Sequence, residues 1–196
     1  MPKIVNHDQR RKNIAQAAIE VIAIKGLEST KLTDIGRLAG VTTGAITHYF
    51  NDKDAVLMAA LEIANDIMLE RMSQVTQKTE YSLFEILSKA LPTSSKSRQA
   101  MAVWLAFWSR SIPEGKVAQQ QITFHQRWHG FVKEQLMHHF TITKKPIPEN
   151  IDDISEGLTA QINGLIIRGL VETSDWPKER QHTMLKNYLH ALKLLT

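Results

Sequence analysis

The sequence contains no cysteine among its 196 residues. Disulfide bridges, thiolate zinc sites, iron–sulfur clusters and cysteine nucleophiles are therefore excluded. It also has no run of about 18 apolar residues that would span a membrane. The basic opening residues are not followed by the apolar core of a secretory signal. We therefore expect a soluble cytoplasmic protein with no membrane partner.

Strand signals are also missing, and proline is scarce. The six prolines lie at the start of the chain or between periodic segments, where helices begin or end. Apolar residues recur with the 3.6-residue period of a helix. The pattern predicts an all-α protein with helices over about 8–25, 32–39, 42–48, 53–77, 82–91, 95–111, 114–140, 150–172 and 178–195.

Sequence patterns of catalysis are likewise absent. No glycine-rich phosphate loop and no serine, histidine and aspartate ordering stands out. His125 and His129 share a helix face four residues apart, but two ligands make an incomplete zinc site. We therefore predict no catalytic residue, no metal and no cofactor. An enzyme built on a helical bundle is the least favoured alternative.

Positive charge is concentrated at the start of the chain. Residues 1–53 carry eight lysines and arginines against five acids, whereas residues 54–196 carry sixteen against fifteen. A positive end indicates an acidic partner such as nucleic acid. The basic residues 10–12 are candidates for contacts with phosphates.

Residues 32–50 have the form of a helix-turn-helix. Two short helices are joined by Gly40 and Val41, and the second opens with hydroxyl and small residues. Gly40 suits a left-handed turn, Thr42 can cap the second helix, and Asp52 can cap a long helix that follows. Such a second helix fits the major groove of DNA with its first residues near the base edges.

The same segment resembles the DNA-binding pattern of the TetR family of bacterial transcriptional regulators. The resemblance rests on residues 39–44 and 48–53, which include His48, Tyr49, Phe50 and Lys53, and it covers about residues 8–60. It implies an N-terminal three-helix helix-turn-helix domain (1–53) and a C-terminal helical ligand-binding and dimerisation bundle (54–196). It also implies repression relieved by a small molecule.

The resemblance carries over a set of contacts with a double-stranded DNA operator. They are assigned to Lys31, Thr33, Thr42, Thr43, Gly44, Thr47, His48, Tyr49 and Lys53. Other roles stay open: a helix cap for Thr42, solvated surface for His48 and core for Tyr49.

Two departures from the family pattern stand out. Lys31 replaces a hydroxyl residue, so Ser29 or Thr30 would have to cap the helix. Gly36 replaces alanine, which is unfavourable by about 1 kcal/mol unless close packing needs it.

Aromatic residues gather in the C-terminal half, where helical spacing places them along helix faces. We predict a ligand pocket from Trp104, Phe107, Trp108, Phe124, Trp128 and Phe131, together with Asn163. Aromatic faces attract quaternary ammonium groups. A plain core stripe is the alternative reading of the same spacing.

Residues 104–108 and 162–168 are similar to a choline-responsive branch of the family that represses glycine-betaine synthesis. That similarity implies choline or another quaternary amine as the small-molecule effector. Asn163 stands where the branch commonly has aspartate.

The last two predicted helices have apolar residues on more than one side, and a lone chain would expose part of that surface. We expect a homodimer whose face includes Ile154, Leu158, Ile162, Leu165, Leu185, Tyr188, Leu189 and Leu192. Gly157 and Gly164 would permit close approach of the helices. A twofold dimer would read a palindromic operator.

The sequence therefore predicts a ligand-responsive dimeric repressor. One alternative is a regulator of an efflux or catabolic operon that senses a different hydrophobic or cationic molecule. Another, of a different class, is a small-molecule binding protein without a role on DNA.

Overall fold

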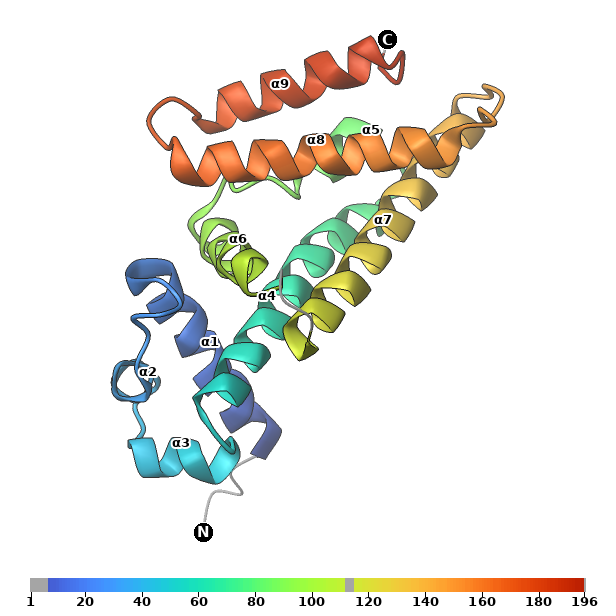
Figure 1. Ribbon diagram of the computed structural model, residues 1–196. Helices are drawn as coiled ribbons and strands as arrows, with labels where there is room; N and C mark the ends of the chain where they lie inside the picture. Colours follow the sequence, from blue (N-terminus) through green and yellow to red (C-terminus); the bar gives the residue numbers. More distant parts are fainter. Residues whose placement is uncertain (1–6, 112–114, 196) are drawn as a thin grey trace.

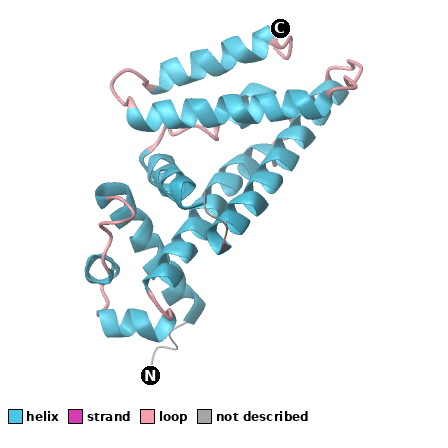
Figure 2. Cartoon of the chain, viewed as in Figure 1, coloured by secondary structure: helices cyan, strands magenta, loops and turns pink. Residues whose placement is uncertain are grey.

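The computed structural model describes residues 7–111 and 115–195, which form helices joined by loops (Figures 1 and 2). Its helices are α1 (His7–Lys25), α2 (Leu32–Ala39), α3 (Thr43–Tyr49), α4 (Lys53–Thr76), α5 (Leu83–Ser88), α6 (Ser95–Trp108), α7 (Lys116–Ile142), α8 (Ile151–Val171) and α9 (Lys178–Ala191). The described residues contain no strand, and no helix among them is long and apolar enough to cross a membrane. The predicted all-α fold is confirmed.

The helix boundaries differ from the predicted ones by only a few residues. The sixth helix ends at Trp108, and a short 3-10 helix (Ser109–Ser111, η1) follows it. The predicted start of the seventh helix, at residue 114, lies outside the described residues. The seventh helix, predicted to end at residue 140, continues to Ile142.

The chain has two hydrophobic cores, and α4 contributes to both. The first core combines α1, α2 and α3 with the first half of α4, from Val56 to Ile67. It also takes Val103 and Phe107 from α6. The second core begins at Met68 on α4 and includes side chains from α5, α7, α8 and α9. Helix α6 therefore reaches directly into the core that supports α2 and α3.

The helices of the second core form a bundle on one end of α4. Figure 1 shows α7 running beside α4, while α8 and α9 lie next to each other as an outer layer. Contacts of α8 with α6 and α7, and of α9 with α5, hold that layer against the rest of the bundle.

Candidate functional site: a DNA-binding surface

The turn between α2 and α3 is built by two glycines. Gly40 ends α2 in the left-handed conformation with φ +67°, which favours glycine over other residues. The Val41 N–H donates to the Gly36 carbonyl over 2.9 Å. A Cβ at Gly36 would lie 2.7 Å from the Val41 carbonyl oxygen. The close packing that would favour glycine at position 36 is therefore present.

Helix α3 is capped at its first turn and anchored by one apolar side chain. The Thr42 Oγ1 accepts a hydrogen bond from the Ala45 N–H over 3.1 Å, so the predicted cap is confirmed. Ile46 is completely buried under the helix. The opposite side of α3 is free, because Thr43, Gly44 and Thr47 are all exposed.

The structure brings the predicted DNA-contact residues to one end of the molecule. Those with exposed side chains or backbone are Lys31, Thr33, Thr42, Thr43, Gly44, Thr47 and His48, whereas Tyr49 and Lys53 are half-buried. Lys53 is the first residue of α4, which is capped by Asp52 through its Oδ1 and the Ala55 N–H at 2.7 Å. A lysine in the first turn of a helix is well placed to hold a phosphate.

The start of α1 fixes the end of α3, which the sequence did not indicate. The Arg11 guanidinium donates to the Tyr49 carbonyl and lies 4.2 Å from the centre of the Phe50 ring. The Tyr49 ring packs against His7, with ring centres 4.5 Å apart, and against His48 at 5.2 Å. Arg11 therefore positions α3, a role that the sequence did not predict for it.

The start of α2 differs from the prediction. No side chain caps this helix at Lys31. The buried Thr30 hydroxyl donates instead to the Gly26 carbonyl over 2.8 Å, at the end of α1. An ion pair between Lys25 Nζ and Asp34 Oδ1 at 2.8 Å also ties α2 to α1, and it holds the pKa of Asp34 below its usual range.

The predicted aromatic pocket is divided between two places. Phe107 is completely buried in the first core, whereas Trp128 is completely buried in the second core with Phe131 stacked on it. Phe124 is 3% exposed in the second core. For these residues the alternative interpretation, a core stripe, is correct, because their helical spacing reflects burial in the cores rather than the lining of a cavity.

The remaining aromatic residues form an edge-to-face cluster between α6 and α7. Trp108 is 37% exposed, and its ring centre lies 5.1 Å from that of His125. It also lies 5.3 Å from the ring centre of Trp104, which is buried in the second core. Burial lowers the pKa of His125, and the carboxylate of Glu156 on α8 acts against that shift. The cluster therefore combines aromatic faces with a nearby negative charge. Asn163, also predicted for the pocket, is half-buried on α8.

Most residues predicted for the dimer face are buried within one chain. Leu158, Ile162, Leu165, Leu185 and Leu189 are at most 3% exposed and belong to the second core. The other three, Ile154, Tyr188 and Leu192, are half-buried against that core. The prediction for these five residues needs correction, because their apolar period serves the packing of α8 and α9 on their own chain.

A short helix with an exposed polar face, capped and joined to the preceding helix by a glycine turn, is the arrangement of a helix-turn-helix protein. The family model for the tetR family of bacterial regulatory proteins matches residues 14–60. The model for the C-terminal region of BetI-type transcriptional repressors matches residues 80–193. The chain belongs to the TetR family and has a BetI-type C-terminal region. Proteins of this family are transcriptional regulators that bind DNA and small-molecule effectors.

Curated relatives match over almost the whole chain. The HTH-type transcriptional regulator BetI 1 of Chromohalobacter salexigens is 30% identical over 193 residues, which cover 96% of this chain and 93% of the relative. BetI of Escherichia coli K12 is 29% identical, with 96% of each chain covered.

Solved structures share the fold at lower identity. A regulator from Saccharomonospora viridis, solved in complex with choline, has a TM-score of 0.80 and 21% identity, and the match covers 93% of this chain and 96% of that one. A transcriptional regulator from Rhodococcus has a TM-score of 0.77 and 23% identity, with 89% and 91% covered.

Proposed function

We propose that this ligand-responsive repressor binds a palindromic operator as a homodimer and controls choline and glycine-betaine metabolism. The observation that carries the proposal is the free polar face of α3, held in place by the Thr42 cap, the glycine turn and Arg11. The BetI relatives supply the class of gene under control.

In the proposed complex, α3 lies in the major groove. Thr42, Thr43, Gly44, Thr47 and His48 meet base edges and the nearby backbone. The small Gly44 has only the Thr42 hydroxyl near its missing Cβ, at 3.9 Å, so the helix is able to approach the DNA closely. Tyr49 and Lys53 contact phosphates on one side of the groove, and Lys31 and Thr33 on the other.

Paired substitutions at the phosphate contacts test DNA binding. Tyr49→Ala with Lys53→Ala is expected to weaken operator binding at least tenfold and to lower the slope of log affinity against log salt by about one. Lys96→Ala, which removes an exposed lysine on α6, serves as the control. Fluorescence anisotropy with labelled DNA measures both quantities. Unchanged affinity in the double variant would support a small-molecule binding protein without a role on DNA.

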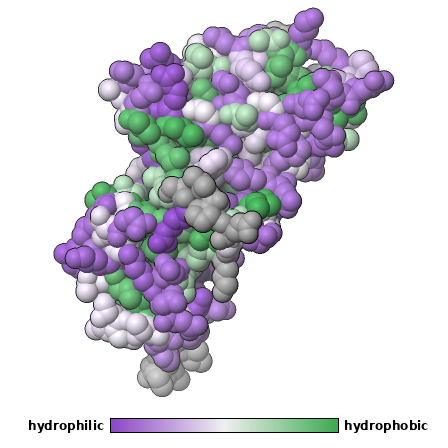
Figure 3. All heavy atoms as spheres, viewed as in Figure 1, coloured by the Kyte–Doolittle hydropathy of each residue, from purple (hydrophilic) through white to green (hydrophobic). Residues whose placement is uncertain are grey.

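The dimer is proposed to form on the exposed side of α8 and α9 rather than on their buried leucines. Ala160, Gly164, Ile167 and Val171 recur at helical spacing along α8, and all four are exposed. Met184 on α9 is 38% exposed. Figure 3 shows hydrophobic surface at the end of α8 nearest α6, where Val171 is 69% exposed. Small residues permit close helix packing, and the exposed apolar residues would lose water on association.

Choline or another quaternary amine is the proposed effector, held at the cluster of Trp104, Trp108 and His125. Tryptophan faces attract a quaternary ammonium, and Glu156 adds a negative charge. Trp108 lies on α6, the helix that also places Phe107 in the first core. A ligand that shifts α6 would therefore favour a form in which the two recognition helices no longer match successive major grooves.

Calorimetry with choline tests the effector site. Trp108→Leu is expected to weaken choline binding at least fivefold, because one cation–π contact is removed. Phe84→Leu, which removes a half-buried ring from α5, is the matched control. No binding of choline to the wild-type protein, with operator affinity unchanged by it, would remove choline from the proposal.

A further inference from the structure

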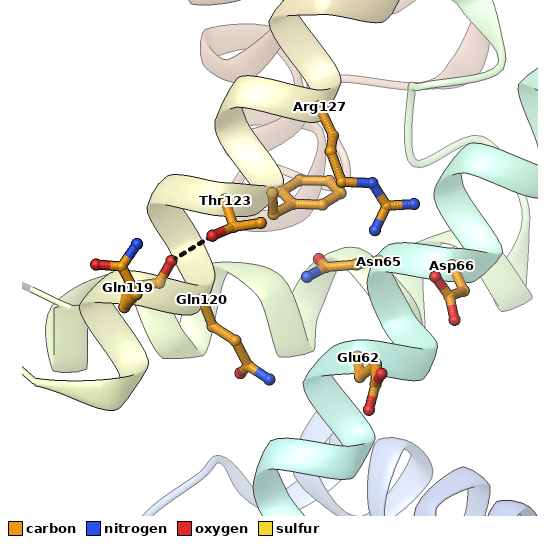
Figure 4. Close-up of a pocket in the computed structure, with 8 residues that line it drawn as sticks. Glu62, Asn65, Asp66, Gln119, Gln120, Thr123 and Arg127 are labelled. Atoms are coloured by element: carbon orange, nitrogen blue, oxygen red, sulfur yellow. Dashed lines mark hydrogen bonds between the residues drawn. The ribbon is translucent and has the colours of Figure 1, made fainter.

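A cleft of about 360 Å³, lined mainly by polar residues, lies between α4 and α7. Its walls include Glu62, Asn65 and Asp66 from α4 and Gln120, Phe124 and Arg127 from α7. Figure 4 shows Arg127 and Gln120 extending from α7 toward the side of the cleft that α4 forms. The volume is at the lower end of the range for sites that bind small molecules.

Two hydrogen-bond acceptors in the cleft have no partner among the described residues. Asn65 is only 8% exposed, and its Oδ1 is buried without a hydrogen bond. Figure 4 shows its side chain pointing from α4 into the space in front of α7. The Oε1 of Gln120 is buried and unpartnered as well. Buried polar atoms are normally hydrogen-bonded, so two orphaned oxygens at one cleft indicate a missing donor.

The charges around the cleft select a cation. Glu62 and Asp66 contribute two negative charges and Arg127 one positive charge, and the ion pairs of the described residues involve none of the three. Among the residues that line the cleft, this leaves an excess of one negative charge, which a ligand with one positive charge matches. Arg11 and Lys12 face the same two carboxylates from a neighbouring groove.

We infer that this cleft is a second small-molecule site, which takes a compact cation with N–H donors, namely a primary ammonium. Its N–H groups donate to Asn65 Oδ1 and Gln120 Oε1, and its charge is balanced by Glu62 and Asp66. The nitrogen of a quaternary ammonium has no N–H and donates to neither amide oxygen. The site therefore differs in chemistry from the proposed choline site, and it stands whether or not choline binds.

The position of the cleft connects it with the DNA-binding surface. Glu62 and Asp66 also border a neighbouring groove of about 310 Å³, whose other wall includes Arg11 and Lys12 of α1 and Phe50. Arg11 is the side chain that holds the end of α3. A cation at the two carboxylates therefore lies next to the contact that positions the recognition helix.

Ethanolamine and choline are matched probes, because they share a hydroxyethyl group and differ in three N–H groups replaced by methyl groups. Calorimetry on the full chain is expected to detect ethanolamine binding that Glu62→Gln with Asp66→Asn weakens at least tenfold. Glu70→Gln, an exposed acid on α4 that does not border the cleft, is expected to leave it unchanged. Trp108→Leu is expected to leave it unchanged as well, which separates this site from the proposed choline site.

Two further variants test the chemistry at each wall. Arg127→Ala is expected to strengthen ethanolamine binding, because it removes a repelling charge, and Asn65→Leu to weaken it at least fivefold. Both carboxylates are exposed, so the acid variants should fold, which thermal unfolding checks. Absence of ethanolamine binding to the wild-type protein would overturn the inference. Equal binding by the double acid variant, or weaker binding by Arg127→Ala, would overturn it too.

Discussion

Gly36 offers a direct test of how the helix-turn-helix is held together. It sits in α2 at the closest approach of that helix to the turn, and its missing Cβ leaves room for the carbonyl group of Val41. We expect Gly36→Ala to destabilise the domain and weaken operator binding, although alanine is a better helix former than glycine.

The size of the effect follows from two opposing contributions. The added Cβ would lie 2.7 Å from the Val41 oxygen and 3.5 Å from the Cδ1 of Ile46. Carbon and carbonyl oxygen normally stay about 3.3 Å apart or more, so the Val41 carbonyl must move away from α2 by roughly 0.6 Å. Overpacking of this kind raises the free energy of the fold by about 1–3 kcal/mol. The better helix propensity of alanine stabilises the fold by at most about 1 kcal/mol. The free energy of unfolding should therefore fall by up to about 2 kcal/mol.

Urea unfolding and operator binding measure the two consequences. The shift of the turn displaces α3, so we expect operator affinity to fall about tenfold, which corresponds to about 1.4 kcal/mol. Gly130→Ala is the control, because a Cβ there meets nothing within 4 Å in the middle of α7. It should stabilise the protein by about 0.5–1 kcal/mol. Wild-type stability and operator affinity in Gly36→Ala would refute the packing argument.

Three other expectations concern charge and assembly. Lys25 holds the pKa of Asp34 low, so the stability that this pair contributes is present above the pKa of an unfolded aspartate, about 3.9, and is lost as pH falls through the folded value. Asp34→Asn should reduce the loss of unfolding free energy as pH falls below about 4, measured by circular dichroism, and an unchanged pH dependence would contradict this. Arg110→Ala removes two ion pairs, one with Glu28 at 3.3 Å and one with Asp54 at 3.4 Å, and both acids are largely exposed. Its unfolding free energy should change by less than about 1 kcal/mol in urea, and a larger loss would mean the pairs are stronger than exposed ones. Ile167→Asp should yield a monomer by light scattering, and an intact dimer would place the interface elsewhere.

The sequence predicts the local features of the DNA-binding half well. Thr42, Asp52 and Gly40 occupy the cap and turn positions expected of them. Such features depend on a residue and its next few neighbours, so they are readable without a structure. The close approach at Gly36 was predicted only as a condition, because its contact with Val41 depends on the angle between two helices.

Contacts between distant segments cannot be predicted from the sequence patterns. The apolar period of α8 and α9 predicts burial but does not say whether the partner is the same chain or a second copy, so Leu158 and Leu185 were assigned to the wrong surface. The aromatic spacing has the same limit, since Phe107 and Trp128 lie in different cores. Asn65 and Gln120 line the same cleft although more than fifty residues separate them, and no local sequence pattern predicts that cleft.

In vitro selection of DNA fragments by the protein, followed by sequencing, examines directly whether it reads a palindromic operator. We expect enrichment of a palindrome whose half-site centres are about 10–10.5 base pairs apart or a multiple of that distance. We also expect that the enrichment disappears in the Tyr49→Ala, Lys53→Ala variant. No enriched sequence, or the same sequence enriched by that variant, would contradict a repressor that reads DNA through α3.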